Sequence, residues 1–314
     1  MPRLMSTSRR MAGRRGLTLV ELMVAILLLA IVGGGIMRVM VKQQQYYTDA
    51  TRSAGAKREL RLGASVLPAE LRSISSSGGD ILTMSESEML THAYIGSSII
   101  CQRGGAGTDE IWVPPLNLAH HTLTSFVIRP QVGDSVFLFN ENLLKGAQDD
   151  QWETRGIVAI DSDAGTCLGP PYTDLALDAS KKRFWFRLNA PIPDSVKVGA
   201  VVRFSRPVKY KIYQEASGSW YLGLQEHVGG SWGTASPLAG PYRPFASGDN
   251  ATSGLQFRYY DSLGVRVTNM ALTNAVSRVD VFLRTNAGIA AIKERNGNAL
   301  RDSVLMRVAI RNFK

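Results

Sequence analysis

The strongest pattern along the chain is a long apolar run close to the N-terminus. From Leu17 to Val41 there are 25 residues, of which only Thr18, Glu21 and Arg38 are strongly polar. At about 1.5 Å per residue a helix of this length measures roughly 37 Å, which is enough to cross a hydrocarbon core of about 30 Å. The run therefore predicts a single membrane-spanning helix.

Beyond the run, apolar residues recur on one face of a helix. Their spacing of 4, 3, 4 and 3 residues is the period of an amphipathic helix, and the residues are Leu60, Ala64, Leu67, Leu71 and Ile74. The sequence SSSGGD at 75–80 then ends the pattern. We therefore expect residues 42–75 to continue the membrane helix 17–41 and to lay an apolar stripe on a globular head.

After residue 80 the pattern changes to that of short strands. Val208, Tyr210 and Ile212 alternate with lysines, and a four-residue loop, ASGS, leads into WYLGLQE at 220–226, which together predict a hairpin. Further strands are predicted at 255–261, 276–284 and 303–312.

These elements fix the expected fold class. Strands do not alternate with helices, so a parallel α/β fold is not expected. We predict an α+β fold in which a long N-terminal helix packs on a mainly antiparallel β-sheet head. The head would span residues 76–314, and residues 114–200 read as an insertion within it.

The charge of the chain is placed unevenly. The formal net charge is +10, but residues 1–16 contain five arginines and no acidic residue. The remaining 298 residues carry 31 basic and 26 acidic side chains, so no nucleic-acid partner is expected for the body of the protein. Basic residues that precede a membrane helix favour a cytoplasmic N-terminus, which would place the head on the opposite side of the membrane.

The segment RRGLTLVELMVAILLLAIV at 14–32 resembles the class III signal of type IV prepilins and type II secretion pseudopilins. Its parts are a basic leader that ends in Gly16, a cut before Leu17, and an acid, Glu21, as the fifth residue of the mature chain. The resemblance implies that a prepilin peptidase of the bacterial inner membrane removes residues 1–16. It also implies N-methylation of Leu17 and assembly into a helical filament. One departure is that the first mature residue of the family is usually Phe.

Looser motifs in the second half of the chain resemble a narrower group. GTDEIWV at 107–113, the hairpin, GLQFRYYDSLG at 254–264, VSRVDVFLR and MRVAIRN occur in this order, and they look like those of PilW-type minor pilins and GspJ-type minor pseudopilins. The implied protein is a structural subunit without catalytic residues or cofactors, whose partners are other minor pilins and the major pilin, or pseudopilins. The sequence also leaves open a membrane-anchored periplasmic module that binds DNA or Ca²⁺.

Glu21 and three glycines are unusual residues for a membrane helix. An ionised carboxylate in lipid costs several kcal/mol unless it is paired, and the new α-amino group of Leu17 in a neighbouring subunit would be such a partner. Alternatively, Glu21 only sits at the membrane interface. Gly33, Gly34 and Gly35 each weaken a helix by about 1 kcal/mol relative to alanine. Our hypothesis is that they form a weak point where the helix can melt or stretch when it leaves the bilayer for a filament.

The two cysteines, Cys101 and Cys167, are the only ones in the chain. An exported head would permit a disulfide between them, and two buried, unpaired thiols are the alternative.

Two short motifs elsewhere suggest chemistry. DSDAG at 161–165 resembles the start of a calcium loop, which makes Asp161 and Asp163 weak Ca²⁺ candidates, and an exposed acidic loop explains the same letters. GGSWG at 229–233 matches a hydrolase nucleophile motif, but every histidine precedes Ser231 and no helix can follow it. We expect a glycine-rich loop there.

Overall fold

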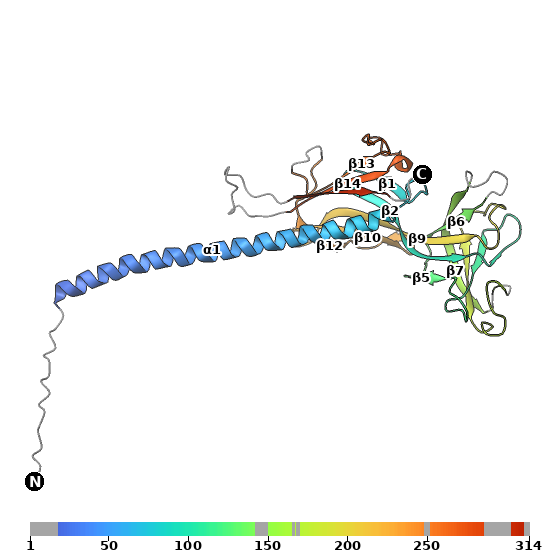
Figure 1. The fold of residues 1–314 in the computed structure, drawn as a ribbon, viewed down its shortest axis with the longest axis horizontal. Coiled ribbons are helices and arrows are strands. Elements are labelled where there is room, and N and C mark those ends of the chain that lie inside the picture. Colours follow the sequence, from blue (N-terminus) through green and yellow to red (C-terminus); the bar gives the residue numbers. More distant parts are fainter. Residues whose placement is uncertain are drawn as a thin grey trace, which may run out of the picture. The chain divides into compact units, whose positions relative to one another are not determined.

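The computed structural model describes residues 18–141, 150–164, 167, 170–247, 252–285 and 303–310. The chain divides into two compact units, Met1–Arg52 and Ser53–Lys314. One helix, α1 (Leu19–Arg72), contributes to both units (Figure 1).

The first unit contains the apolar part of α1. Between Leu19 and Val41 every side chain is exposed, and the helix is long and apolar enough to cross a membrane. An uncovered apolar surface of this kind needs lipid or other apolar helices around it.

The second unit begins with the last part of α1, which packs on the head. Leu67 and Leu71 are fully buried, and Leu60 and Ile74 are nearly so, as the 4-3-4-3 spacing predicts. The helix comes so close to the head that a Cβ atom on Gly63 would lie 2.5 Å from the Tyr242 hydroxyl oxygen. Glycine at this position therefore sets how closely the helix can pack.

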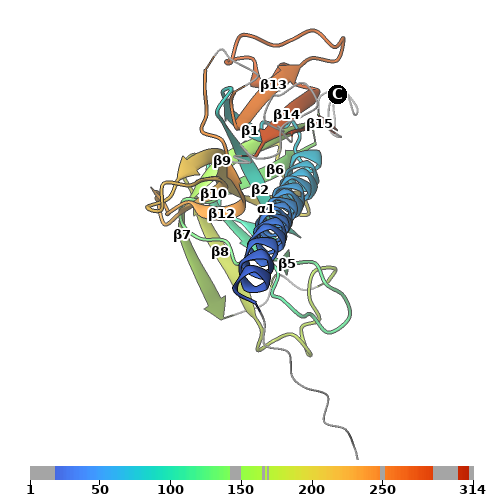
Figure 2. The same ribbon diagram turned by 90° about the vertical axis from the view of Figure 1, so that its left-hand side faces the viewer.

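The head is built from two antiparallel sheets (Figure 2). Among the described residues the larger sheet has twelve strands, of which eight follow the order β1-β2-β9-β6-β7-β8-β4-β3, while β10 pairs with β9, β11 and β12, and β5 pairs with β2. The strands of this sheet are β1 (Ile81–Met84), β2 (Glu88–Ile99), β3 (Gln102–Arg103), β4 (Glu110–Val113), β5 (Ser125–Phe126), β6 (Ser135–Asn140), β7 (Gln151–Ala164), β8 (Lys182–Leu188), β9 (Val201–Gln214), β10 (Trp220–Val228), β11 (Ser231–Trp232) and β12 (Ser236–Tyr242). The smaller sheet has the order β13 (Leu255–Tyr260), β14 (Arg278–Arg284) and β15 (Ser303–Ala309), and a short 3-10 helix, η1 (Thr273–Ala275), precedes β14.

This architecture confirms the α+β fold class. The predicted hairpin is β9–β10, and its loop, 215–219, is one residue longer than the sequence suggested. The loop closes through a turn in which the Gly218 N–H donates to the Glu215 carbonyl at 2.9 Å, with Gly218 at a φ of 80°.

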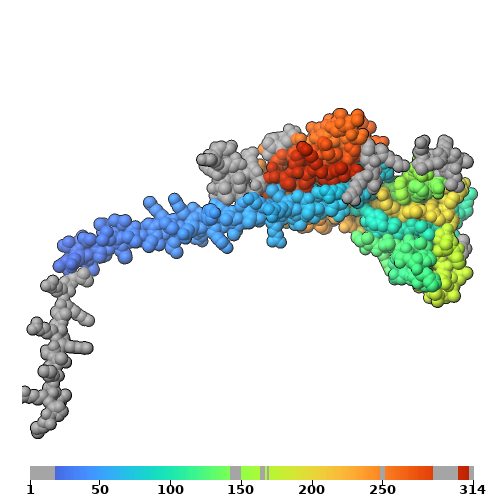
Figure 3. Space-filling model, in the orientation of Figure 1, coloured from blue at the N-terminus to red at the C-terminus, as the bar shows by residue number. Residues whose placement is uncertain are grey.

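The head has two hydrophobic cores. The helix-side core joins the end of α1 to β9, β10 and the smaller sheet, and Figure 3 shows β13–β15 in orange and red along the light-blue end of α1. The distal core lies among β2, β4, β6, β7, β8 and β9, and its members are Ile95, Ile100, Ile111, Val113, Val136, Leu138, Ile157, Phe186, Leu188, Ile192, Val196, Val202 and Phe204. Residues 114–200 thus supply strands β5–β8 and much of the distal core.

Strand β9 runs through both cores. Its Val202 and Phe204 belong to the distal core, and its Val208, Tyr210 and Ile212 to the helix-side core. The residues between these two groups, including Arg206, therefore lie where the cores meet.

Candidate functional site

The start of helix α1 is closed by three reciprocal hydrogen bonds between Thr18 and Glu21. The Thr18 backbone N–H and hydroxyl both donate to Glu21 Oε2, at 3.0 and 3.1 Å, and the Glu21 N–H donates back to the Thr18 hydroxyl at 3.3 Å. This is a capping box, which satisfies N–H groups that a helix end otherwise leaves free. The spacing T-x-x-E is its signal in the sequence, and the sequence analysis missed it.

The cap gives Glu21 a local partner within its own chain. Both bonds to the carboxylate end on Oε2, and within the described residues Oε1 accepts no hydrogen bond. A second donor from outside the chain could therefore bind Glu21 without breaking the cap. Gly16 and Leu17, the residues of the expected cut, lie outside the described residues.

The three glycines of the apolar run continue the helix without a break. Gly33, Gly34 and Gly35 are helical and exposed, and a Cβ atom on any of them would meet nothing within 4 Å. Alanine fits all three positions, so replacing the glycines changes the helix propensity without creating a clash.

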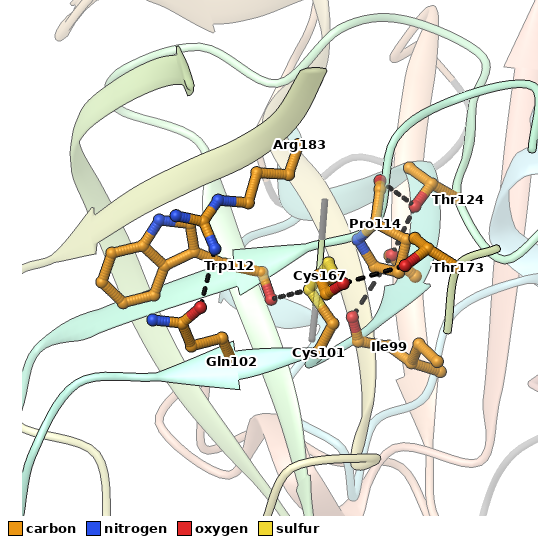
Figure 4. The surroundings of a disulfide bond; sticks show 10 residues. Ile99, Cys101, Gln102, Trp112, Pro114, Thr124, Cys167, Thr173 and Arg183 are labelled. Carbon is orange, nitrogen blue, oxygen red and sulfur yellow. Dashed lines mark hydrogen bonds between the residues drawn. A yellow bond between two sulfur atoms is a disulfide. The ribbon is translucent and has the colours of Figure 1, made fainter. Parts of the chain in front are cut away.

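Cys101 and Cys167 form a disulfide in the distal part of the head (Figure 4). Their Cα atoms are 5.5 Å apart, both residues are fully buried, and the bond closes a loop of 66 residues. Hydrogen bonds hold each end, because the Cys101 N–H donates to the Trp112 carbonyl at 3.0 Å and the Thr173 hydroxyl donates to the Cys167 carbonyl at 2.8 Å. A loop of this length corresponds to about 4 kcal/mol of stabilisation in the chain-entropy description.

The calcium candidates do not lie in a loop. Asp161 and Asp163 belong to strand β7, in register with Trp185 and Arg183 of β8. The reading of this segment as an exposed acidic loop was therefore wrong, because its pairing with β8 overrides the turn-like composition. Within the described ranges no group of three or more His, Cys, Asp or Glu side chains could hold a metal, and the Ca²⁺ site stays a prediction.

Ser231 lies in a tight hairpin between β10 and β11. Gly229 and Gly230 have positive φ angles of 61° and 84°, which glycine adopts readily, and Ser231 pairs with Val228. A glycine-rich turn followed by a strand, rather than a nucleophile elbow, confirms the expectation from the sequence.

A buried ion pair connects the two cores. Arg206 donates from Nε and Nη2 to the two carboxylate oxygens of Asp134, at 2.9 and 3.0 Å, and from Nη1 to Glu226 at 3.2 Å. The side chains of Arg206 and Asp134 are only 5% and 1% exposed. The hydrogen bond to Asp134 raises the pKa of Arg206 above its usual value, so the guanidinium of this central ion pair remains charged.

A histidine that the sequence analysis passed over is buried close to this pair. His92 on β2 is 6% exposed, and its Nε2 lies 3.1 Å from the hydroxyl of Ser135, which follows Asp134. Its ring packs edge-on against Phe137, with the ring centres 5.1 Å apart. Burial lowers the pKa of His92 from 6.5 to about 4, and the nearby Arg203 adds to the effect, so His92 is neutral at pH 7.

We expect the head to lose stability as the pH falls from about 6.5 towards 4, because the unfolded chain binds a proton at His92 before the folded chain does. The shift of His92 amounts to at most roughly 3 kcal/mol of unfolding free energy. The burial of Asp80 raises its pKa and acts in the opposite sense. The measurement is therefore a comparison of wild type with His92→Gln at each pH, by denaturant unfolding of the full chain in detergent. We expect the unfolding free energy of His92→Gln to decrease less with falling pH than that of the wild type. If the two free energies decrease in parallel, the low pKa of His92 is not the cause.

Comparison with known families gave one match. Residues 11–37 match the prokaryotic N-terminal methylation motif, which covers the expected cut, Glu21 and the three glycines. Comparison with curated proteins and with solved structures gave no match. The N-terminus is thus that of a type IV pilin-like or pseudopilin-like protein, and such a motif implies processing by a prepilin peptidase and assembly with other pilins.

Proposed function

We propose that this protein is a minor pilin, a non-enzymatic structural subunit that helps to initiate or cap the assembly of a type IV pilus. In this proposal, prepilin peptidase cuts between Gly16 and Leu17, and Leu17 is then N-methylated. Before assembly the chain is anchored in the bacterial inner membrane with its head in the periplasm. It then enters the filament with other minor pilins and the major pilin. The same geometry would serve a minor pseudopilin of a type II secretion system, in which pseudopilins are the partners.

One observation carries this proposal. An acid stands at the third position of a helix whose other residues as far as Met37 are apolar and exposed, and a processing motif spans the same segment. In a plain membrane anchor this carboxylate would serve only as a helix cap, which does not need a charge. A filament has one, because the α-amino group of a neighbouring Leu17 can pair with it among packed apolar helices.

Glu21→Gln is the variant that tests the filament role. Glutamine can still close a capping box, so we expect α1 to form and the leader to be removed. The charge is lost, however, and an unpaired amine among apolar helices costs about 3–5 kcal/mol. We expect the amount of this protein in sheared, purified filaments to fall at least ten-fold.

Thr18→Val is the matched control for Glu21→Gln. It removes the hydroxyl of the cap and leaves the carboxylate, so incorporation should decline much less. If Thr18→Val abolishes incorporation and Glu21→Gln does not, the cap rather than the charge is what Glu21 provides.

Gly33, Gly34 and Gly35 provide a second test in the same filaments. Replacing all three with alanine strengthens the helix by about 3 kcal/mol in total and leaves the processing motif's Gly16 and Leu17 unchanged. We expect normal removal of the leader and impaired assembly, because the helix can no longer melt or stretch there. Unchanged assembly of the triple variant would rule out the weak-point hypothesis.

A further inference from the structure

A small cavity lies between the end of α1 and the larger sheet. Its volume is about 130 Å³, and all the residues that line it belong to the second unit. Its walls are mostly apolar, with Val66 of α1 on one side and Ala93, Val208, Leu224 and Leu238 from four neighbouring strands forming much of the remainder.

The cavity opens beside an exposed apolar patch. Tyr94 and Ile128 both line the cavity and are 48% and 46% exposed, and Val127, next to Ile128, is 76% exposed. We call these three residues the apolar rim. Contiguous exposed apolar side chains next to a concave site are typical of surfaces that other proteins cover.

Two carboxylates give the cavity a negative character. Glu70 and Glu226 both line it, and Glu226 is 41% exposed. Among the described residues that line the cavity the one cation is Arg206, which is already engaged by both oxygens of Asp134 as well as by Glu226. Within the described part of the chain Glu70 forms no ion pair and instead accepts a hydrogen bond from the Tyr210 hydroxyl, so its negative charge has no cationic partner.

Tyr210 also lines the cavity, and burial and both carboxylates raise the pKa of its hydroxyl. Burial raises the pKa of Tyr210, and the Glu70 and Glu226 carboxylates raise it further. Both carboxylates therefore act on the same interior point, although they come from different elements, α1 and β10.

The size of the cavity restricts what can occupy it. Pockets for whole ligands or cofactors measure about 300–1,000 Å³, whereas a cavity of about 150 Å³ holds one small ring. A space of 130 Å³ therefore suits a single side chain. Lysine and arginine combine an apolar stem with a charged end, and such side chains lay the stem along apolar walls.

We infer that this cavity is a socket for one lysine or arginine side chain of a partner protein, whose flanking apolar residues cover the rim of Tyr94, Val127 and Ile128. The stem would lie against Val66 and Leu224, and the charge would meet Glu70 and Glu226. The inference uses residues of the second unit alone, and it holds whether or not the chain enters a filament.

The test uses the full chain in detergent and three labelled hexapeptides that differ at one central position. The variable position is lysine, norleucine or glutamate, and the residues around it are apolar in all three peptides. Binding is measured by fluorescence anisotropy at low salt. We expect the lysine peptide to bind about five-fold or more tightly than the norleucine peptide, and the glutamate peptide to bind weakest. Equal binding of the lysine and norleucine peptides would overturn the inference, and so would no binding of the lysine peptide up to millimolar concentration.

Two variants locate the binding in the socket. Glu70→Gln should remove the advantage of lysine over norleucine, and Ile128→Ser should weaken both peptides. Asp194→Asn is the control, because this exposed carboxylate does not line the cavity, and it should change neither. An unchanged preference for lysine in Glu70→Gln would place the binding elsewhere and contradict the socket. Because Glu70 is exposed, we expect Glu70→Gln to be as stable as the wild type. Denaturant unfolding verifies this if both proteins unfold at the same denaturant concentration.

Discussion

Asp134→Ala is expected to destabilise the head by about 3–5 kcal/mol, because it strands the positive charge of Arg206 in the protein interior. Arg206 loses both of its hydrogen bonds to Asp134 and keeps only the bond to the partly exposed Glu226. The backbone also loses a hydrogen bond, because the Asp134 carboxylate accepts the Gln131 N–H at 2.8 Å. We expect a large loss of stability because Arg206 lies on β9 where the two cores meet.

Denaturant unfolding of the full chain in detergent measures this loss. Asp194→Ala is the matched control, since it also breaks an Arg–Asp pair, with Arg103 at 3.1 Å, but its aspartate side chain is 71% exposed. An exposed pair is worth about 0–1 kcal/mol. Similar losses in the two variants would mean that the burial of the central ion pair has no energetic consequence.

The double variant Asp134→Leu with Arg206→Met separates the pair from the packing around it. Removing both charges leaves no uncompensated ion in the interior, since Glu226, which also loses its partner, is 41% exposed, so we expect much of the stability lost in Asp134→Ala to return. If the double variant is as unstable as Asp134→Ala, the loss comes from packing and not from the stranded charge.

Gly16→Val is expected to abolish the removal of the leader. The resemblance to class III signals places the cut directly after Gly16, and a branched side chain there would obstruct a site that accepts glycine. The unprocessed chain should migrate as a species 16 residues longer than the wild-type protein in cells with an active prepilin peptidase. Gly13→Val, three residues earlier in the same leader, is the control and should be processed normally.

The helix and the strands near the C-terminus could be predicted because each carries its own periodicity. The stripe from Leu60 to Ile74 and the alternation of Val208, Tyr210 and Ile212 both reflect burial on one face, and local sequence records it directly. The Thr18–Glu21 cap was also readable from its T-x-x-E spacing.

The middle of the head could not be read in this way. Strand β7 contains Asp161 and Asp163, residues that are common in turns, and only its pairing with β8 makes it a strand. His92 and Ser135 are 43 residues apart in sequence, and Asp134 and Arg206 are 72 apart. No periodicity connects residues at such separations, so the buried histidine, the central ion pair and the socket emerged only from the fold.

The N-terminal residue of the mature protein is the most direct test of the proposed function. Mass spectrometry of the chain purified from cells with prepilin peptidase should find a peptide that begins with N-methylated Leu17. A chain that begins at Met1, or one cut after the apolar run so that Glu21 is lost, would contradict the assignment as a pilin.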